Sequence, residues 1–428
     1  MDLRINKIKG LQGELELPGD KSISHRAAII GAMSSGKTTA TGFLNTGDCL
    51  STLRCLSELG IKIEGIGGER LAIHGRGLHG FKEPEDILDA GNSATTARLV
   101  TGLLSGQDFF STVTGDDSLR QRPMNRVTDP LVRMGASIWG RDKASRLPLA
   151  IRGGRLSGIR YTSSIASAQI KSALIIAGLL ADGETTITEP HLSRDHTERM
   201  LRFMGVDISI KGLLISVQGG SQPKAMDVDI PADISSAAFF IAGALITGDS
   251  ELTIRQVGVN QTRTGMIDVL KDMGADILFD RMSMKCQESR ADIIVKSGRL
   301  KNARISGDII PRLIDEIPVL AVVATQAEGQ TIFDDIGELR VKETDRIKAI
   351  VDGLQKMGAD VKEIDDGFIV KGPTPLKGCQ VESYGDHRIA MAMATAGLVA
   401  DGETTIRGAE CMQVSFPGFE KVLQRAAK

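Results

Sequence analysis

Clusters of small polar and charged residues recur along this sequence, each where an apolar, helix-forming run begins. They read GDKSISHR, GNSATTAR, SSIASAQIK, PADISS, PRLIDE and YGDHR. The free N–H groups and the positive dipole end of a helix N-terminus bind phosphate and carboxylate groups. Serine and asparagine at such positions are also ordinary N-caps. Because the clusters fall at equivalent points of a repeat, we interpret them as one shared anion site.

A second set of charged clusters, SLRQRP, SRDHTER and RVKETDR, marks the expected starts of further helices. Lys342 and Arg346 are four residues apart, so we expect them together in a first helical turn, with Glu343 beside Arg346. These charges could instead form a solvated helix face with weak ion pairs. The helix dipole disfavours cations in a first turn, and a bound anion would offset that cost.

The elements that must position these clusters form a sixfold repeat. Six times, an apolar helical run ends at a glycine that leads into a short strand, as in ADGETTITEP and ADGETTIRGA. A second helix then ends at Leu-Gly or Met-Gly and turns into another strand, as in MGADI and MGADV. The pattern predicts an α/β fold with two similar domains of three βαβαββ units each.

The domain boundaries follow from the incomplete sixth unit, which lacks its last strands. The N-terminal strand, from Asp2 to Leu17, could supply them. We therefore expect residues 1–19 and 232–428 to form one domain and residues 20–231 the other. The two chain crossings would act as a hinge, with the active site in the cleft between the domains.

Composition excludes several classes of protein. The net charge is −2 and aromatic residues make up 4%, so neither nucleic acid nor an anionic membrane is an expected partner. The start MDLRINKIKG has no apolar signal segment, and the longest apolar run, Ala237 to Ile246, is about half a membrane span. Five scattered cysteines without a Cys-x-x-Cys pair favour a cytoplasmic location and argue against a zinc site. We expect a monomer.

One motif points to a different class of enzyme. The segment from Gly31 to Thr38 matches the P-loop pattern GxxxxGK[ST] of nucleotide-binding proteins. A P-loop follows a strand and opens a helix. Here a helical run precedes the match and a strand-like TTATGF follows, so we reject a P-loop NTPase. A repeat scaffold without activity is the other alternative, but it gives no reason to concentrate Lys and Arg at helix starts.

The motifs PGDKSISHR, GNSAT, RQRP, ASAQIKSA, SRDHTE, LIDEIPVLA, VKETDR and GDHR occur in an order that resembles the enolpyruvyl transferase family. The resemblance runs from about residue 18 to about residue 416. It implies two domains built as inside-out α/β barrels. Sister enzymes with a UDP-N-acetylglucosamine acceptor open the first helix with a GAKNAA-like segment and carry a loop cysteine. This chain has GDKSIS and no cysteine in TGDDSLRQRP, which favours the branch that uses shikimate 3-phosphate.

The resemblance implies a reaction and a set of residues. The enolpyruvyl group of phosphoenolpyruvate is transferred to the 5-hydroxyl of shikimate 3-phosphate, and phosphate is released. The implied ligands of shikimate 3-phosphate are Lys21, Ser22, Arg26, Ser167, Ala168, Gln169, Arg194, Asp315 and Lys342. Those of phosphoenolpyruvate are Lys21, Ala94, Arg122, Gln169, Arg346 and Arg388. Arginine suits the second role because it binds carboxylate and phosphate through two parallel hydrogen bonds.

The implied acid–base groups are Asp315, Glu343 and Lys21, among which the sequence does not divide the roles. Read without the resemblance, Asp315 could be a helix-terminal acid and Glu343 an ion-pair partner. His387 could be a packed core residue, and we expect it to orient Arg388. Glyphosate-sensitive relatives usually have Gly at the position of Ala94, and some relatives have Lys at that of Val414. With Ala94, Val414 and Arg194 at these positions, the chain resembles the second subgroup of the family, whose members are often tolerant to glyphosate.

Overall fold

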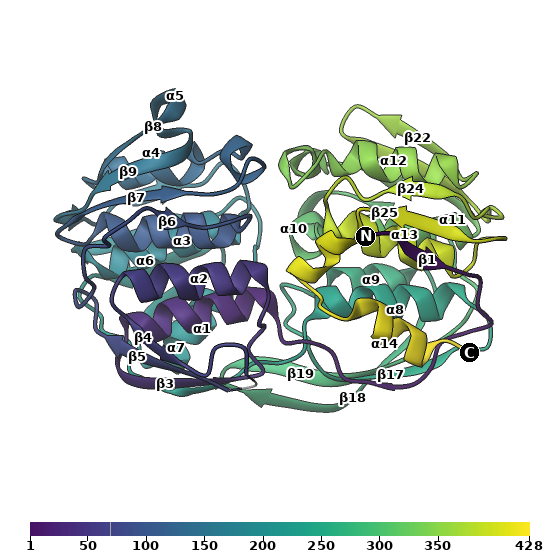
Figure 1. Cartoon of the computed structure of the whole chain (residues 1–428), viewed down its shortest axis with the longest axis horizontal. Coiled ribbons are helices and arrows are strands. Elements are labelled where there is room, and N and C mark those ends of the chain that lie inside the picture. Colours follow the sequence, from purple (N-terminus) through teal and green to yellow (C-terminus); the bar gives the residue numbers. More distant parts are fainter. Residues whose placement is uncertain (69) are drawn as a thin grey trace. The chain divides into compact units, whose positions relative to one another are not determined.

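The computed structural model describes residues 1–68 and 70–428 of the chain, which divide into two compact units. Unit 1 comprises Met1–Pro18, Pro231–Met284 and Ser289–Lys428, and unit 2 comprises Gly19–Ile230 and Lys285–Glu288. Each unit has its own hydrophobic core. The first and last segments of the chain both belong to unit 1, so unit 2 is inserted into unit 1 (Figure 1).

Unit 2 contains three repeats, each with a four-stranded sheet. Its helices are α1 (Lys21–Met33), α2 (Gly47–Glu58), α3 (Ala94–Ser105), η1 (Leu119–Gln121), α4 (Asn125–Arg133), α5 (Arg141–Ala144), α6 (Ala168–Leu179) and α7 (His196–Phe203). The first sheet has the order β16 (Asp227–Asp229), β3 (Ser35–Thr41), β5 (Arg70–Arg76), β4 (Lys62–Glu64). The second is β6 (Leu88–Asp89), β7 (Phe110–Thr114), β9 (Arg146–Arg152), β8 (Ser137–Gly140). The third is β11 (Arg160–Thr162), β13 (Glu184–Thr188), β15 (Leu214–Gln218), β14 (Ile208–Lys211), and β10 (Leu156–Ser157) pairs with β12 (Ala181–Asp182).

Unit 1 follows the same plan. Its helices are α8 (Ile234–Ile246), α9 (Gly265–Asp272), η2 (Gly307–Ile309), α10 (Ile310–Leu313), α11 (Ile317–Gln326), η3 (Gly337–Val341), α12 (Arg346–Lys356), α13 (His387–Gly397), η4 (Ala409–Val414) and α14 (Phe419–Ala426). One sheet is β18 (Asp276–Lys285), β19 (Glu288–Lys296), β17 (Glu251–Gly258), β2 (Gln12–Leu15). Another is β20 (Arg304–Ile305), β21 (Gly329–Phe333), β23 (Gly367–Gly372), β22 (Asp360–Ile364). The last is β1 (Leu3–Ile5), β25 (Thr404–Arg407), β24 (Gln380–Glu382). The predicted mixed α/β fold is confirmed.

The N-terminal segment forms two strands that join different sheets. Strand β1 pairs antiparallel with β25, with Leu3 opposite Ile406, and so joins the sheet of the sixth repeat. Strand β2 pairs in parallel with β17 instead, with Gly13 opposite Leu252. The prediction of one strand from Asp2 to Leu17 is therefore wrong, because the segment serves both the fourth and the sixth repeat.

The first helix of each repeat lies in the core of its unit. In α8 every residue from Ile234 to Leu245 is buried, as expected for a helix that is apolar on all sides. The helices α1, α3 and α6 of unit 2 are similarly enclosed. Lys37 and Thr38 of the P-loop match lie inside strand β3, which confirms that this match is not a phosphate-binding loop.

The tip of the β18–β19 hairpin, Lys285–Glu288, packs within unit 2. Glu288 Oε1 lies 2.7 Å from His196 Nδ1, and both side chains are buried. Arg199 donates a hydrogen bond to the Gln287 carbonyl at 3.0 Å. The hairpin therefore adds two chain crossings to those near Pro18 and Ile230.

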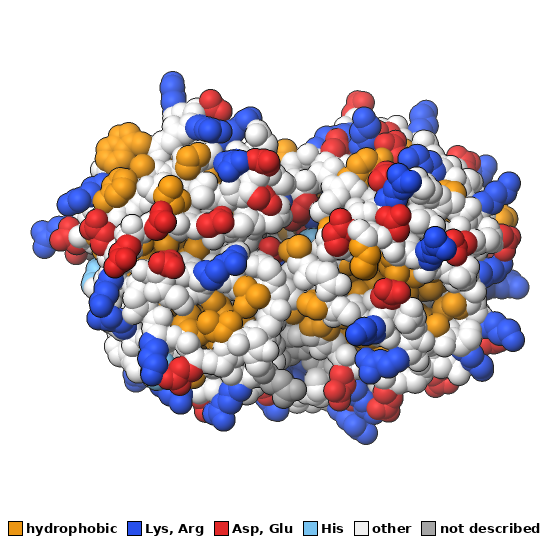
Figure 2. Space-filling model, viewed as in Figure 1, with side chains coloured by type: hydrophobic (Ala, Val, Ile, Leu, Met, Phe, Trp, Pro, Cys, Tyr) orange, Lys and Arg blue, Asp and Glu red, His pale blue; other side chains and the backbone are white. Residues whose placement is uncertain are grey.

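Charges on the drawn face of the molecule are mixed in sign, and no large area of one sign stands out (Figure 2). Among the described residues, no helix has the length and apolar character needed to span a membrane.

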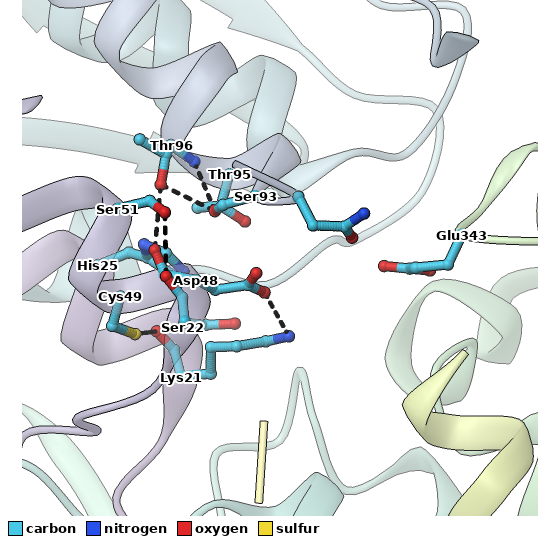
Figure 3. A network of polar contacts seen from close by, with 12 residues as sticks. Lys21, Ser22, His25, Asp48, Cys49, Ser51, Ser93, Thr95, Thr96 and Glu343 are labelled. Atoms are coloured by element: carbon cyan, nitrogen blue, oxygen red, sulfur yellow. Dashed lines mark hydrogen bonds and ion pairs between the residues drawn. The ribbon is translucent and has the colours of Figure 1, made fainter. Parts of the chain in front are cut away.

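A buried chain of polar groups joins the helices α1, α2 and α3. His25 Nδ1 lies 2.7 Å from Thr52 Oγ1, which lies 2.7 Å from Thr96 Oγ1. Thr96 in turn contacts Ser93 Oγ at 2.8 Å (Figure 3). Burial, together with the charges of Lys21 and Arg26, holds the pKa of His25 well below its usual value. The imidazole is therefore neutral in the folded protein.

We expect the neutral state of His25 to make the protein sensitive to acid. Below pH about 6.5 the unfolded chain binds a proton at this residue that the folded chain excludes, so stability falls as the pH is lowered. The loss is at most about 1.4 kcal/mol per pH unit. Urea unfolding between pH 7.5 and 5.5 should show a shallower pH dependence in His25→Asn than in the unmodified chain. The exposed His79→Asn is the control, and equal pH dependence in all three proteins would contradict the expectation.

Candidate functional site

The residues predicted for the site belong to both units. Unit 2 contains Lys21, Ser22, Arg26, Ala94, Arg122, Ser167, Ala168, Gln169 and Arg194, and unit 1 contains Asp315, Lys342, Glu343, Arg346 and Arg388. Most of these residues lie at or just before the first turns of helices, and Arg26 lies one turn further along α1. Among the described residues, no group of three or more His, Cys, Asp and Glu side chains could hold a metal ion.

Lys21 is the first residue of α1, and two carboxylates accompany it. The Asp20 side chain caps the helix by accepting a hydrogen bond from the Ile23 N–H at 2.9 Å. Lys21 Nζ lies 3.0 Å from Asp48 Oδ2, and both side chains are mostly buried (Figure 3). The carboxylates offset the cost of a cation at a helix N-terminus. Asp48 is absent from the predicted site, because nothing in GDCLSTL distinguishes it from an ordinary first-turn acid.

Ser22, Arg26 and Arg194 lie together in unit 2. The guanidinium of Arg26 donates to the Ser22 carbonyl at 2.9 Å, to Ser172 Oγ at 2.8 Å and to Thr197 Oγ1 at 2.7 Å. Arg194, in the loop before α7, donates to Ser22 Oγ at 3.4 Å. Two cationic groups thus flank the first turn of α1.

The starts of α3 and α6 are also linked. Gln169 donates to Thr95 Oγ1 at 2.9 Å, and Arg98 donates to Gln169 Oε1. Ala94 is the first residue of α3, where Ser93 caps the helix. Ser167, the N-cap of α6, makes no side-chain hydrogen bond to its helix. The N-cap residues of α1 and α3, Asp20 and Ser93, each accept a hydrogen bond from their helix, whereas the Ser167 side chain does not.

Arg122 is held against the GNSAT segment. Its guanidinium donates to Asn92 Oδ1 at 2.8 Å, to the Asn92 carbonyl at 3.2 Å and to Ser118 Oγ at 3.2 Å. Asn92 precedes the Ser93 cap of α3, so these bonds place Arg122 near the start of that helix.

In unit 1, three carboxylates surround Arg346. Its guanidinium contacts Asp386 Oδ2 at 2.7 Å, Asp315 Oδ1 at 3.2 Å and Glu343 Oε2 at 2.6 Å. The side chain of Arg346 is 1% exposed. Burial alone lowers its pKa, but the carboxylates of Asp386, Glu343 and Asp315 outweigh burial and raise it. Arg346 therefore stays charged, and the two predicted acid–base carboxylates share it.

Arg388 lies beside the same carboxylates. It donates to the Asp315 carbonyl at 3.2 Å, and its guanidinium lies 3.6 Å from Asp315 Oδ2. Asp386 caps α13 by accepting from the Arg388 N–H at 2.8 Å. Asp386 therefore holds the guanidinium of Arg346 and the backbone of Arg388. The GDHR motif contains Asp386, but the sequence predicts no role for it.

Lys342 and Glu343 lie between η3 and α12, outside both helices. The helix α12 begins at Arg346, and Asp345 caps it by accepting from the Lys348 N–H at 3.1 Å. The prediction that Lys342 stands in the first turn of this helix is therefore wrong. Asp345 is a strong N-cap residue, so the helix starts after it.

The geometry suits anionic ligands in both units. Lys21, Arg122 and Arg194 in unit 2 and Arg346 and Arg388 in unit 1 present cationic groups near helix N-termini, whose dipoles add to their attraction for anions. Each cation is held by carboxylates, hydroxyls or carbonyls, so its position is set before a ligand arrives. The carboxylates of Asp315 and Glu343 lie beside the cations of unit 1.

Comparison with known proteins gives consistent results along the whole chain. A family model described as EPSP synthase (3-phosphoshikimate 1-carboxyvinyltransferase) matches residues 5–423. A 3-phosphoshikimate 1-carboxyvinyltransferase of Pelotomaculum thermopropionicum is 52% identical over 426 residues, covering 99% of each chain. One from Bacillus cereus is 52% identical over 419 residues, covering 98% of this chain and 97% of the relative.

Solved structures agree. An EPSP synthase from Acinetobacter baumannii superposes with a TM-score of 0.89 at 44% identity, covering 100% of this chain and 98% of that one. The enolpyruvyl transferase NikO from Streptomyces tendae shares the fold at a TM-score of 0.77 and 18% identity, covering 99% of this chain and 97% of that one. By its full-length family match and its relatives at about half identity, the chain belongs to the EPSP synthase family.

Proposed function

We infer that this chain is a transferase that moves the enolpyruvyl group of phosphoenolpyruvate to the 5-hydroxyl of shikimate 3-phosphate and releases phosphate. It thereby serves the shikimate pathway and aromatic amino-acid biosynthesis. The observation that carries this inference is the 52% identity, over nearly the whole chain, to enzymes named 3-phosphoshikimate 1-carboxyvinyltransferase. The charged network around Arg346 supports it, because both substrates are anions with phosphate and carboxylate groups.

The reaction requires balanced proton transfers. The 5-hydroxyl oxygen bonds to C2 of phosphoenolpyruvate and loses its proton, while C3 gains a proton. The C3 proton is then removed as the bond from C2 to the phosphate oxygen breaks. Positioned bases and acids contribute to such steps, and fixed cations stabilise the developing charge.

We propose that residues of both units serve this reaction. In unit 2, Ser167, Ala168 and Gln169 bind the phosphate of shikimate 3-phosphate, supported by the uncapped start of α6. Ser22 and Arg26 bind its carboxylate, and Arg194 and Lys21 lie beside them. Arg122, Ala94 and Gln169 face phosphoenolpyruvate. In unit 1, Arg346 and Arg388 bind phosphoenolpyruvate, and Lys342 contacts the hydroxyls of the ring.

The proposed proton carriers are Asp315, Glu343 and Lys21. Asp315 and Glu343 both bond to Arg346. A substrate carboxylate or phosphate that takes a place on Arg346 would compete with these two carboxylates. Binding would then free a carboxylate to accept a proton. This coupling gives a physical reason for two acids and one arginine to share a site.

We further propose a monomer in a reducing cytoplasm, without metal or organic cofactor. The five cysteines are free thiols, as expected of proteins kept under reducing conditions. The glyphosate-tolerant subgroup is also a proposal, which rests on Ala94, Arg194 and Val414.

Phosphate release tests the function directly. We expect the purified protein to release phosphate from phosphoenolpyruvate only when shikimate 3-phosphate is present. Because fixed cations do the electrostatic work, a chelator should leave the rate unchanged. A coupled phosphate assay measures both. Dependence on ATP or on added Mg²⁺ would contradict the assignment.

Asp315→Asn tests the proposed base. The substitution keeps the shape and the polar contacts to Arg346 but removes the proton acceptor, so turnover should fall by about 10²–10⁴-fold while substrate binding persists. Steady-state kinetics with a binding measurement for shikimate 3-phosphate separate the two effects. Asp352→Asn on α12 is the control outside the proposed site. Near-normal turnover of Asp315→Asn would remove this residue from the mechanism.

Ala94→Gly tests the proposed tolerance. Ala94 is the first residue of α3. We propose that its methyl group narrows the space for glyphosate, which is longer than phosphoenolpyruvate. Overpacking costs about 1–3 kcal/mol, or roughly 5- to 150-fold in binding. We expect weak glyphosate inhibition that strengthens by such a factor in Ala94→Gly. Ala97→Gly, on the same helix, controls for lost helix propensity. Equal inhibition constants in the unmodified enzyme and Ala94→Gly would exclude the steric explanation.

A further inference from the structure

Unit 2 contains a fully buried ionic cluster that the proposed reaction does not use. Its members are Lys171 of α6, Glu189 after β13 and Glu198 of α7, with side chains 1–2% exposed. Lys171 Nζ lies 2.7 Å from Glu189 Oε2, 2.7 Å from Glu198 Oε1 and 3.4 Å from the Ser193 carbonyl. An ammonium group has three N–H donors, so these three contacts satisfy it.

The cluster ties both ends of one loop to α6. The loop runs from Glu189 to Arg194, between β13 and α7. Lys171 holds Glu189 at its start and the Ser193 carbonyl near its end. Ser193 Oγ also donates to Glu189 Oε1, which closes the loop on itself. The only residue between this clamp and the N-cap of α7 is Arg194.

Neighbouring contacts continue the same attachment. Ser172, next to Lys171, lies 2.6 Å from Thr197 Oγ1, next to Glu198. Arg26 donates to both of these hydroxyls. Adjacent residue pairs of α6 and α7 are therefore joined twice, once by charge and once by hydroxyl groups. The N-terminal turns of α1, α6 and α7 are fixed together.

The charge on Lys171 is maintained in this environment. Burial by itself lowers the pKa of Lys171, but Glu198 and Glu189 outweigh burial and the pKa is raised. Burial raises the pKa of Glu198 against the opposing effect of Lys171. A buried ion pair is weak evidence for stability, since its desolvation cost offsets its attraction. Its effect on the position of the loop is therefore the feature to explain.

We propose that Lys171 is a positioning residue, which with Glu189, Glu198 and Ser193 fixes the loop so that Arg194 stays beside Ser22. Through Arg194 the loop contacts the start of α1, because the Arg194 guanidinium lies 3.4 Å from Ser22 Oγ. This inference rests on the proposed function, in which Arg194 and Ser22 bind shikimate 3-phosphate. It predicts that loss of the clamp weakens binding of that substrate selectively, because Arg194 loses its fixed place.

The test is a double-mutant cycle with Arg194→Ala. Lys171→Met combined with Glu198→Gln removes the clamp and keeps the formal charge of the cluster, since Glu189 remains. We expect the KM for shikimate 3-phosphate to rise about tenfold and the KM for phosphoenolpyruvate to stay within about twofold. In the Arg194→Ala background, the same clamp substitutions should cause little further change, because coupled residues are not additive.

A milder variant and a matched control keep the test decisive if the clamp variant does not fold. Ser193→Ala removes only the Ser193 hydroxyl, and the same cycle applies to it with a smaller rise in KM. Arg202→Met on α7 is the control, because its guanidinium contacts the Ile208 carbonyl at 3.1 Å and no residue of the loop.

Two outcomes would overturn the positioning role. In the first, the increases in the KM for shikimate 3-phosphate caused by the clamp substitutions and by Arg194→Ala multiply in the combined variant. The other is an equal rise in KM for both substrates. Failure of the proposed function is distinct from either, since the unmodified protein would then release no phosphate with the two substrates present.

Discussion

A helix that is buried on nearly every side must still satisfy the N–H groups at its start, and this constraint organises both units. The first helix of each repeat is buried over most of its length, and its polar residues gather toward its N-terminus. Asp20, Ser93, Asp233 and Asp386 meet the need as side-chain caps. The polar clusters of the sequence are first of all the consequence of burying these helices.

The same constraint explains why cations are found where the helix dipole disfavours them. Lys21 and Arg346 each open a helix, and each is accompanied by carboxylates that restore the local charge balance. The compensation is close to complete around Arg346, where three acids share one guanidinium. Such a cluster is held in place by its own charges. In the proposed function, an incoming substrate anion exchanges with acids that are already present, which couples binding to proton transfer without a large movement of the arginine.

The sequence was informative where the physics is local and repetitive. The periodic helices, their glycine ends and the strands that follow predicted the α/β class and showed that the segment around Lys37 is no P-loop. The motifs also identified the arginines that the structure places at helix starts. The sequence predicted fewer of the contacts between residues that lie far apart in the chain. Asp48 and Asp386 gave no signal of their own, because an acid beside a helix start is common. The predicted start of α12 was too early, because the prediction included Lys342 in its first turn, whereas Asp345 caps the helix and α12 begins at Arg346.

The sequence did not predict that the hairpin tip Lys285–Glu288 belongs to unit 2, because its partners lie far away in the chain. His196 and Glu288 are 92 residues apart, and no local pattern links them. This feature bears on the order in which the nascent chain can fold. Residues 19–230 leave the ribosome before Glu288 is made, so until then the buried His196 has no acid to meet its Nδ1 atom. The last segment of unit 2, Lys285–Glu288, is therefore synthesised after the first part of unit 1 that follows residue 230. A gene fragment that encodes only residues 19–230 would lack Glu288, the buried acid that pairs with His196.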